Sequence, residues 1–219
     1  MQELDTIEIP LEHQKIYMPT KKPVIKGIIF DLGGVIMSGG YLPFINQYCL
    51  ECLTEQGKKK IEKLEHLVNL GTITEQQFYR SIQAIFHLHL SPQQMHDIIV
   101  SKMLPNKSLM KFIPKLKKAK IALFTNSIGH MAPDVLKQRK VPVKKIFDKT
   151  FVSIKIHLAK PDTHAYKYVV KKMNFPPAEM LMVDDRKENI DAVKKMGMHG
   201  IIFKNTAQLK REIKKYQLV

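Results

Sequence analysis

The stretch 24-VIKGIIFDLGG-34 joins a short apolar block to an aspartate and two glycines. Residues 24–30 are too few for a helix and rich in β-branched side chains, which favours a buried strand. Asp31, Gly33 and Gly34 then mark a turn whose backbone amides can approach an anion closely. Similar apolar blocks follow, each reached through a predicted helix, at residues 121–124, 149–153, 180–183 and 200–203. Strands that alternate with helices predict an α/β fold with a doubly wound parallel sheet.

The region from about residue 41 to residue 102 breaks this rhythm, because it contains no convincing strand and is typical of successive amphipathic helices. One helix is predicted over residues 58–70, and Gly71 fits its end. Thr74, with Gln77 three residues on, predicts the capping box of the next helix. A helical insertion directly after the first strand predicts a cap over the carboxyl ends of the strands, where open α/β sheets bind ligands. An ordinary helical subdomain without motion is the alternative.

The predicted organisation has three parts: an N-terminal extension over residues 1–22, an α/β core formed by residues 23–38 and 105–219, and a helical cap formed by residues 39–104. The extension is polar and lacks periodicity, so we expect it to lie on the surface or to be partly disordered. Acidic residues stand where a secretory signal needs positive charge, and no apolar run is long enough to span a membrane. We therefore expect a cytoplasmic protein without a membrane segment.

The composition is that of a globular protein, with 219 residues, 44% of them apolar and 26% charged, and a net charge of +16. Such a charge can indicate nucleic-acid binding. However, the excess is almost entirely lysine, whereas recognition of phosphates and bases favours arginine. The lysines are also dispersed over the exposed faces of predicted helices. This pattern argues against a nucleic-acid partner and favours a solvated surface that steers anionic substrates inward.

Cys49 and Cys52 form a lone Cys-x-x-Cys pair. Such a pair can be redox-active or can supply half of a zinc site. Tetrahedral zinc needs two further ligands at similarly close spacing, and the sequence offers no evident second pair. We therefore expect two reduced thiols on the cap helices.

Polar side chains follow three further predicted strands or loops. Thr125 and Asn126 come directly after an apolar strand, where they can hold a phosphate oxygen or cap the next helix. Lys160 precedes a predicted helix and can balance the charge of a carboxylate and a phosphoryl group. Asp184 and Asp185 stand side by side after another strand, a pairing that favours a bound cation over a solvated loop. Each of these sequence signals is weak alone, so their interpretation depends on the order in which they occur along the chain.

In that order, FDLGGV at 30–35, FTNS at 124–127, AKPD at 159–162 and VDDRKENI at 183–190 resemble the motifs of the haloacid dehalogenase superfamily of phosphohydrolases. The resemblance extends from residue 24 to about residue 203. It implies a Rossmann-like core, and the helical insertion is similar to the small caps of subclass I. The activity implied is hydrolysis of a phosphoric monoester.

The resemblance also implies a role for each matching residue. Asp31 would be the nucleophile and form an aspartyl-phosphate, which divides one displacement into two. Thr125 would hydrogen-bond the phosphoryl group, and Lys160 would neutralise charge. The implied catalytic residues are Asp31, Thr125 and Lys160; the implied phosphate-binding residues are Gly33, Thr125, Asn126 and Lys160; and the implied ligands of Mg²⁺ are Asp31, the Gly33 carbonyl, Asp184 and Asp185.

One position departs from the family pattern. Most phosphatases of the superfamily carry a general acid/base aspartate two residues after the nucleophile, and here that position is Gly33. Such a group is typically worth about 10²- to 10⁴-fold in rate. We therefore expect a small phosphorylated metabolite with a leaving group that needs little protonation. The alternatives are a catalytically weak or inactive binding protein and a metal-independent 2-haloacid dehalogenase. His157, close before Lys160, is a candidate contact to the substrate, while the substrate's identity and the oligomeric state stay open.

Overall fold

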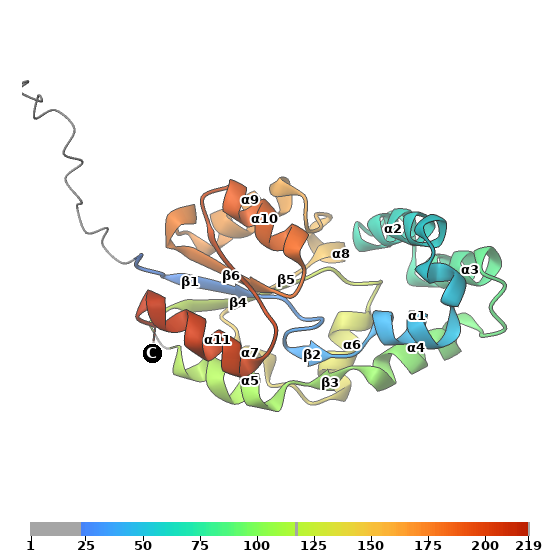
Figure 1. Ribbon diagram of the computed structural model, residues 1–219, viewed down its shortest axis with the longest axis horizontal. Coiled ribbons are helices and arrows are strands. Elements are labelled where there is room, and N and C mark those ends of the chain that lie inside the picture. The colour runs from blue at the N-terminus through green and yellow to red at the C-terminus, as the bar shows by residue number, and fades with distance from the viewer. Residues whose placement is uncertain (1–22, 117, 219) are drawn as a thin grey trace, which may run out of the picture.

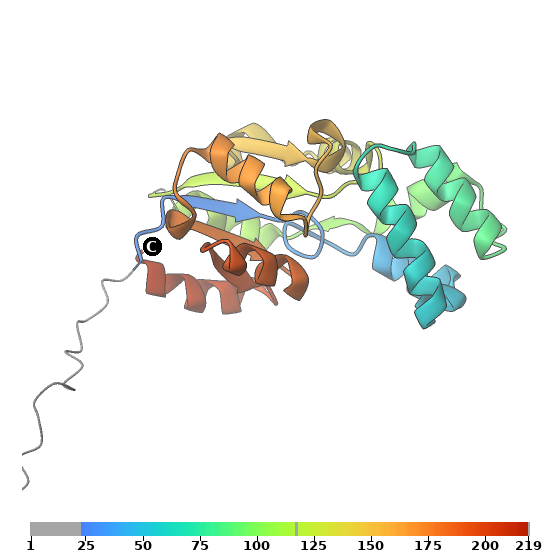
Figure 2. The same cartoon turned by 90° about the horizontal axis from the view of Figure 1, so that it is seen from above.

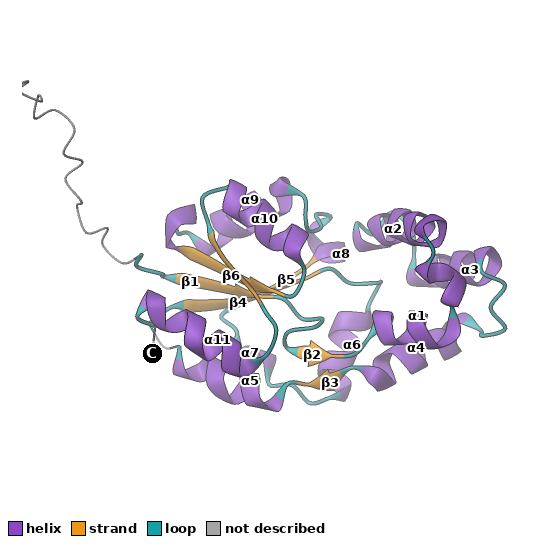
Figure 3. Ribbon diagram, in the orientation of Figure 1, coloured by secondary structure: helices purple, strands orange, loops and turns teal. Residues whose placement is uncertain are grey.

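The computed structural model describes residues 23–116 and 118–218, so the predicted N-terminal extension lies outside the described residues. At its centre is a parallel five-stranded sheet in the order β5-β4-β1-β6-β7 (Figure 3). Its strands are β1 (Gly27–Phe30), β4 (Lys120–Thr125), β5 (Lys149–Val152), β6 (Met180–Asp184) and β7 (His199–Ile202). The predicted α/β fold and parallel sheet are confirmed, and the five strands match the five apolar blocks to within a few residues.

Alternating side chains of the central strand β1 supply both hydrophobic layers. Ile28 and Phe30 join one buried cluster, whereas Ile29 joins another on the opposite face of the sheet. Figure 1 shows α9 and α10 over one face and α5, α6 and α11 over the other. The helices of this part are α5 (Lys107–Phe112), α6 (Met131–Gln138), α7 (Val143–Ile146), α8 (Ser153–Ile156), α9 (Thr163–Met173), α10 (Lys187–Lys195) and α11 (Thr206–Ile213), with short 3₁₀ turns η2 (Ile113–Lys115), η3 (Pro177–Glu179) and η4 (Lys214–Tyr216). Both faces of the parallel sheet are therefore covered.

A helical insertion leaves this core after β1 and returns before β4. Two short strands, β2 (Met37–Ser38) and β3 (Leu104–Pro105), pair antiparallel where the chain goes out and comes back. Between them lie α1 (Tyr41–Tyr48), the 3₁₀ turn η1 (Leu50–Leu53), α2 (Glu55–Asn69), α3 (Glu75–Ile85) and α4 (Pro92–Lys102). Within the described residues, the chain between β2 and β3 forms no strand, as expected. Figure 2 shows them beyond the carboxyl ends of the core strands.

The ends of the inserted helices follow local capping. The capping box predicted at Thr74 and Gln77 is present, with the Thr74 side chain accepting from the Gln77 N–H and the Gln77 side chain accepting from the Thr74 N–H. The predicted start of the preceding helix at residue 58 was wrong by three residues. Thr54 accepts a hydrogen bond from the Gly57 N–H and so caps α2 one turn earlier.

The prediction of two reduced thiols is contradicted, because the structure joins Cys49 and Cys52 in a disulfide. Cys49 ends α1, and the turn of η1 that follows lets the Cys52 N–H donate to the Cys49 carbonyl. This turn brings the two Cα atoms to 5.3 Å, within the usual span of a disulfide. The Cys-x-x-Cys spacing alone does not reveal the 3₁₀ turn that orients both side chains.

None of the helices in the described ranges combines the length and the apolar character needed to cross a bilayer.

Candidate active site

Three carboxylates meet at the carboxyl edge of the sheet. Phe30, the last residue of β1, pairs with Val183 of β6, and the Asp31 N–H donates to the Val183 carbonyl at 3.0 Å. The next residues therefore emerge together, and carboxylate oxygens of Asp31, Asp184 and Asp185 lie within 4.8 Å of one another. Like charges this close repel unless a cation balances them. Hard carboxylate oxygens are the ligands that Mg²⁺ prefers, so the set fits that ion.

Lys160 supplies one positive charge to this cluster. Its Nζ lies 2.6 Å from Asp31 Oδ1 and 2.7 Å from Asp184 Oδ2, and its side chain is 3% exposed. Burial lowers the pKa of Lys160, but the carboxylates of Asp31 and Asp184 outweigh burial and hold that pKa above its usual value. The ammonium group is therefore charged and bridges the two strand ends.

The carboxyl group of Asp31 is held under opposing influences. Burial raises the pKa of Asp31, Lys160 lowers it, and the charges of Asp184 and Asp185 raise it further, so that the pKa lies at about 7. A single ammonium group thus does not fully offset the loss of water and two neighbouring negative charges. Additional positive charge beside Asp31 would favour its ionised form, which is the form that can attack.

Asp184 is fully buried, and both of its oxygens already accept hydrogen bonds. Oδ2 accepts from Lys160, while Oδ1 accepts from Asn189 Nδ2 and from the Arg186 N–H, each at 2.9 Å. Burial raises the pKa of Asp184, but Lys160 and these hydrogen bonds together hold it below its usual value. Asp184 therefore orients Lys160, whereas the side chain of Asp185 is more exposed and faces the loop after β1.

The two glycines after Asp31 differ in what they allow. Gly34 has a φ of 72°, and a Cβ there would lie 2.1 Å from Asp185 Oδ2, so only glycine permits this approach. Gly33 has no such constraint, because a Cβ at this position would meet nothing within 4 Å among the described residues. Position 33 is thus open space next to the nucleophile.

The side-chain amide of Asn126 forms hydrogen bonds with both the N–H and the carbonyl of Lys160. Its Nδ2 donates to the Lys160 carbonyl at 2.8 Å, and its Oδ1 accepts the Lys160 N–H at 2.9 Å. The side chain predicted to bind phosphate is therefore occupied in fixing Lys160. Thr125, buried at the end of β4, donates to the adjacent Asn126 carbonyl at 2.9 Å. Sequence reasoning missed the Asn126 clamp, because no local pattern links positions 126 and 160.

His157 contacts the inserted helices. Its Nδ1 is 3.0 Å from the Leu70 carbonyl at the end of α2, so the ring joins the core to the inserted helices. Two other contacts join the same parts: Glu75 Oε2 accepts the His130 N–H, and Arg139 donates to the carbonyls of Val100, Ser101 and Met103. The loop between α2 and α3 is therefore held against the loops that carry Asn126 and Lys160.

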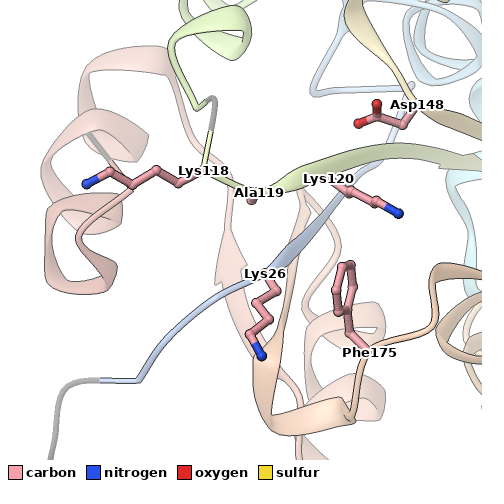
Figure 4. Close-up of a pocket in the computed structure, with 6 residues that line it drawn as sticks. All are labelled: Lys26, Lys118, Ala119, Lys120, Asp148 and Phe175. Carbon is pink, nitrogen blue, oxygen red and sulfur yellow. The ribbon is translucent and has the colours of Figure 1, made fainter.

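A surface pocket of about 380 Å³ opens at the other end of the sheet, where β1 and β4 begin (Figure 4). Its lining residues are Lys26, Lys118, Ala119, Lys120, Asp148 and Phe175. Lys26 is paired with Glu179, and Asp148 accepts the Ile121 N–H. The pocket is separated from the carboxylate cluster by the length of β1, so it is not part of the candidate active site.

Comparison with known proteins agrees with this geometry. The chain is 22% identical over 184 residues to a phosphorylated carbohydrates phosphatase of Thermotoga maritima (81% of this chain, 84% of that protein). It is 30% identical over 98 residues to the sesquiterpene phosphatase astK of Aspergillus oryzae (44% of this chain, 50% of that protein). In two other curated relatives it spans no more than 15% of the protein's length.

A solved structure shares the whole fold. The crystal structure of a HAD family enzyme from Bacteroides thetaiotaomicron superposes with a TM-score of 0.70 at 19% identity, covering 87% of this chain and 98% of that one. A family model described as haloacid dehalogenase-like hydrolase matches residues 25–197, which include all four motifs. The chain therefore belongs to the haloacid dehalogenase-like hydrolases.

Proposed function

We propose that this protein is a Mg²⁺-dependent phosphohydrolase that acts on a small phosphorylated metabolite through an aspartyl-phosphate at Asp31. The observation that carries the proposal is the cluster of Asp31, Asp184 and Asp185 within 4.8 Å, joined by the buried ammonium group of Lys160. The two phosphatases among the relatives act on a carbohydrate phosphate and a sesquiterpene phosphate by name, which supports a phosphate ester as substrate. A structure of the Bacteroides enzyme with magnesium and inorganic phosphate supports the metal.

The proposed reaction has two displacements at phosphorus. An Asp31 oxygen forms a bond to phosphorus while the bond to the leaving-group oxygen breaks, and the electron pair departs with that oxygen. Water then attacks the phosphorus, the bond to Asp31 breaks, and phosphate and the free carboxylate result. Lys160 orients the nucleophile through Oδ1 and balances charge in both steps. The backbone N–H groups at Gly33 and Asn126 are proposed donors to the phosphoryl oxygens. The Thr125 hydroxyl is a third proposed donor, which would exchange its bond to the Asn126 carbonyl for one to the phosphoryl group.

Mg²⁺ would be held by Asp31, Asp185 and the Gly33 carbonyl, with Asp184 adding negative charge behind them, and would supply positive charge against the phosphoryl oxygens. Asp184 keeps its own hydrogen bonds from Lys160, Asn189 and Arg186 in this arrangement. The chain's own contribution is thus a fixed set of charges that needs little rearrangement during the reaction.

We further propose that α1–α4 form a cap that selects the substrate, with residues 39–104 as the cap and residues 23–38 and 105–219 as the core. The inserted helices stand at the edge of the sheet where the carboxylates emerge (Figure 2). Parallel sheets bind ligands at that edge, so any leaving group larger than the phosphoryl group must extend toward these helices. The identity of the metabolite is then a property of the insertion.

The test is turnover of a panel of phosphate esters with Mg²⁺ or with EDTA, for the wild type, Asp31→Asn and the control Asp134→Asn, which changes an exposed aspartate on α6. We expect Mg²⁺-dependent release of phosphate that Asp31→Asn abolishes and Asp134→Asn leaves intact. Activity unchanged by Asp31→Asn would remove this residue from the mechanism. Metal-independent release of halide from 2-halo acids would favour the dehalogenase instead, and no turnover at all would favour a binding protein, the alternative that Gly33 keeps open.

A further inference from the structure

The proposed phosphohydrolase needs a source of protons that the core loop does not provide. A leaving alkoxide must gain a proton, and the water of the second step must lose one. Position 33, the usual place for such a group in the family, is Gly33, and a Cβ added there would meet no heavy atom within 4 Å among the described residues. A carboxyl group from another element therefore has room to approach the nucleophile.

Glu65 is the acidic residue on the inward face of the cap helix α2. Ile61 and Val68 on the same helix are 7% and 0% exposed, and Glu65 lies four residues after the first and three before the second. Residues with this spacing share one side of a helix. Glu65 is accordingly half-buried, whereas Glu62 on the adjacent face is exposed. The helix itself lies beyond the carboxyl ends of the strands and packs against α8 (Figure 2).

The surroundings of Glu65 suit a group that exchanges protons. It forms no hydrogen bond or ion pair within the part of the chain that the structure describes. Burial raises its pKa, the charge of Arg186 lowers it, Glu62 raises it, and the pKa is above the usual value overall. Arg186 directly follows Asp185, so this charge interaction connects the cap helix to the rim of the carboxylate cluster.

The side chain of Tyr41 belongs to the surroundings of Glu65. Its hydroxyl group is buried and has no hydrogen-bond partner in the described residues. Burial and then the charge of Glu65 raise the pKa of Tyr41, so the two groups belong to one neighbourhood. A buried hydroxyl without a partner costs free energy unless a ligand pairs with it. A carboxyl group and an unpartnered hydroxyl group thus lie in one part of the inserted helices.

We propose that Glu65 is the general acid and base of this enzyme and replaces the aspartate that position 33 lacks; the inference rests on the proposed phosphohydrolase function. In the first step the Glu65 carboxyl gives its proton to the leaving-group oxygen as the bond from that oxygen to phosphorus breaks. In the second step the Glu65 carboxylate takes a proton from water as the water oxygen bonds to phosphorus and the Asp31–phosphorus bond breaks. The products are an alcohol and phosphate, and Glu65 ends protonated as it began.

The experiment compares Glu65→Gln with Glu62→Gln on two substrates, p-nitrophenyl phosphate, whose leaving group needs no proton, and an alkyl phosphate, whose leaving group does. Glutamine keeps the shape but cannot exchange the proton. We expect Glu65→Gln to lower kcat/KM for the alkyl phosphate by about 10²- to 10⁴-fold and to leave kcat/KM for p-nitrophenyl phosphate nearly unchanged, because this ratio reports the first displacement. The kcat values fall for both substrates, because hydrolysis of the aspartyl-phosphate loses its base. The limb of the pH profile that belongs to Glu65 disappears for the alkyl phosphate. Glu62→Gln, on the exposed face of the same helix, keeps the wild-type rates at the pH optimum and shifts that limb only to lower pH, because the Glu62 charge raises the pKa of Glu65.

A rescue variant separates chemistry from structure. Gly33→Asp has room for its side chain, so adding it to Glu65→Gln restores turnover of the alkyl phosphate. Equal losses of kcat/KM on both substrates, no loss of kcat/KM on the alkyl phosphate, or a wild type that turns over only p-nitrophenyl phosphate would each overturn the role of Glu65. In all three cases an inactive Asp31→Asn leaves the phosphohydrolase standing. If Asp31→Asn is as active as the wild type, the proposed function fails first and the role of Glu65 fails with it.

Discussion

Replacement of Lys160 by methionine tests whether the ammonium group holds the site together. Methionine keeps the length of the side chain but removes the charge that lies 2.6 Å from Asp31 and 2.7 Å from Asp184. Two buried carboxylates then face each other without a partner. Removing one member of a buried ion pair typically costs about 3–5 kcal/mol. For a chain of this size 1 kcal/mol shifts Tm by about 2–4 °C, so the metal-free protein should lose roughly 6–20 °C.

The assay is thermal unfolding in EDTA at several pH values, with Lys167→Met, an exposed lysine of α9, as the control. Because the folded pKa of Asp31 lies above its usual value of 3.8, its charge destabilises the fold increasingly as pH rises from about 4 toward 7. Without Lys160 this cost grows, so the Tm deficit of Lys160→Met should widen from pH 5 to pH 8. Adding Asp184→Asn should recover part of the loss. A deficit no larger than that of Lys167→Met, or one independent of pH, would refute the reasoning.

Three further outcomes are expected. Gly34→Ala places a methyl group against Asp185 in a backbone conformation with φ of 72°, so it should weaken Mg²⁺ binding measured by calorimetry and lower stability by about 1 kcal/mol or more; unchanged affinity would contradict the close packing. Asn126→Ala should lower kcat strongly and Tm only slightly, because it frees the Lys160 backbone. Asn126→Asp, which still accepts the Lys160 N–H, should retain part of the rate. The Cys49–Cys52 disulfide predicts no thiol reactive toward maleimide in the denatured, unreduced protein and two after reduction.

The fold was predictable because β1, β4 and β6 each contain a short buried apolar run, whereas β5 has only Phe151 and Val152 as apolar residues. The parallel arrangement followed from the helices between the runs. Helix ends were less certain, since the start of α2 depends on the Thr54 hydroxyl and not on periodicity. The disulfide was missed because its formation depends on a 3₁₀ turn that the sequence of the segment does not specify.

The candidate site likewise has a part that the sequence predicts and a part that only the folded structure shows. Asp31, Lys160 and Asp184 each lie within a sequence motif, and the structure shows Lys160 in hydrogen-bond contact with both aspartates. The hydrogen bonds between Asn126 and Lys160 join residues 34 positions apart, so only the folded chain reveals them. Glu65 is likewise one of several acids along α2 in the sequence, and only packing distinguishes its face from the exposed ones.

The short ribbon of β2 and β3 makes the inserted helices a replaceable module. Met37 pairs with Pro105 and Ser38 with Leu104, so the points where the chain departs from the core and rejoins it are neighbours in space. A different set of helices can be attached at the same two points without altering the order of the sheet or the spacing of its carboxylates. If the inserted helices select the substrate as proposed, chimaeras exchanged at this junction should take the reaction from one parent and the choice of substrate from the other.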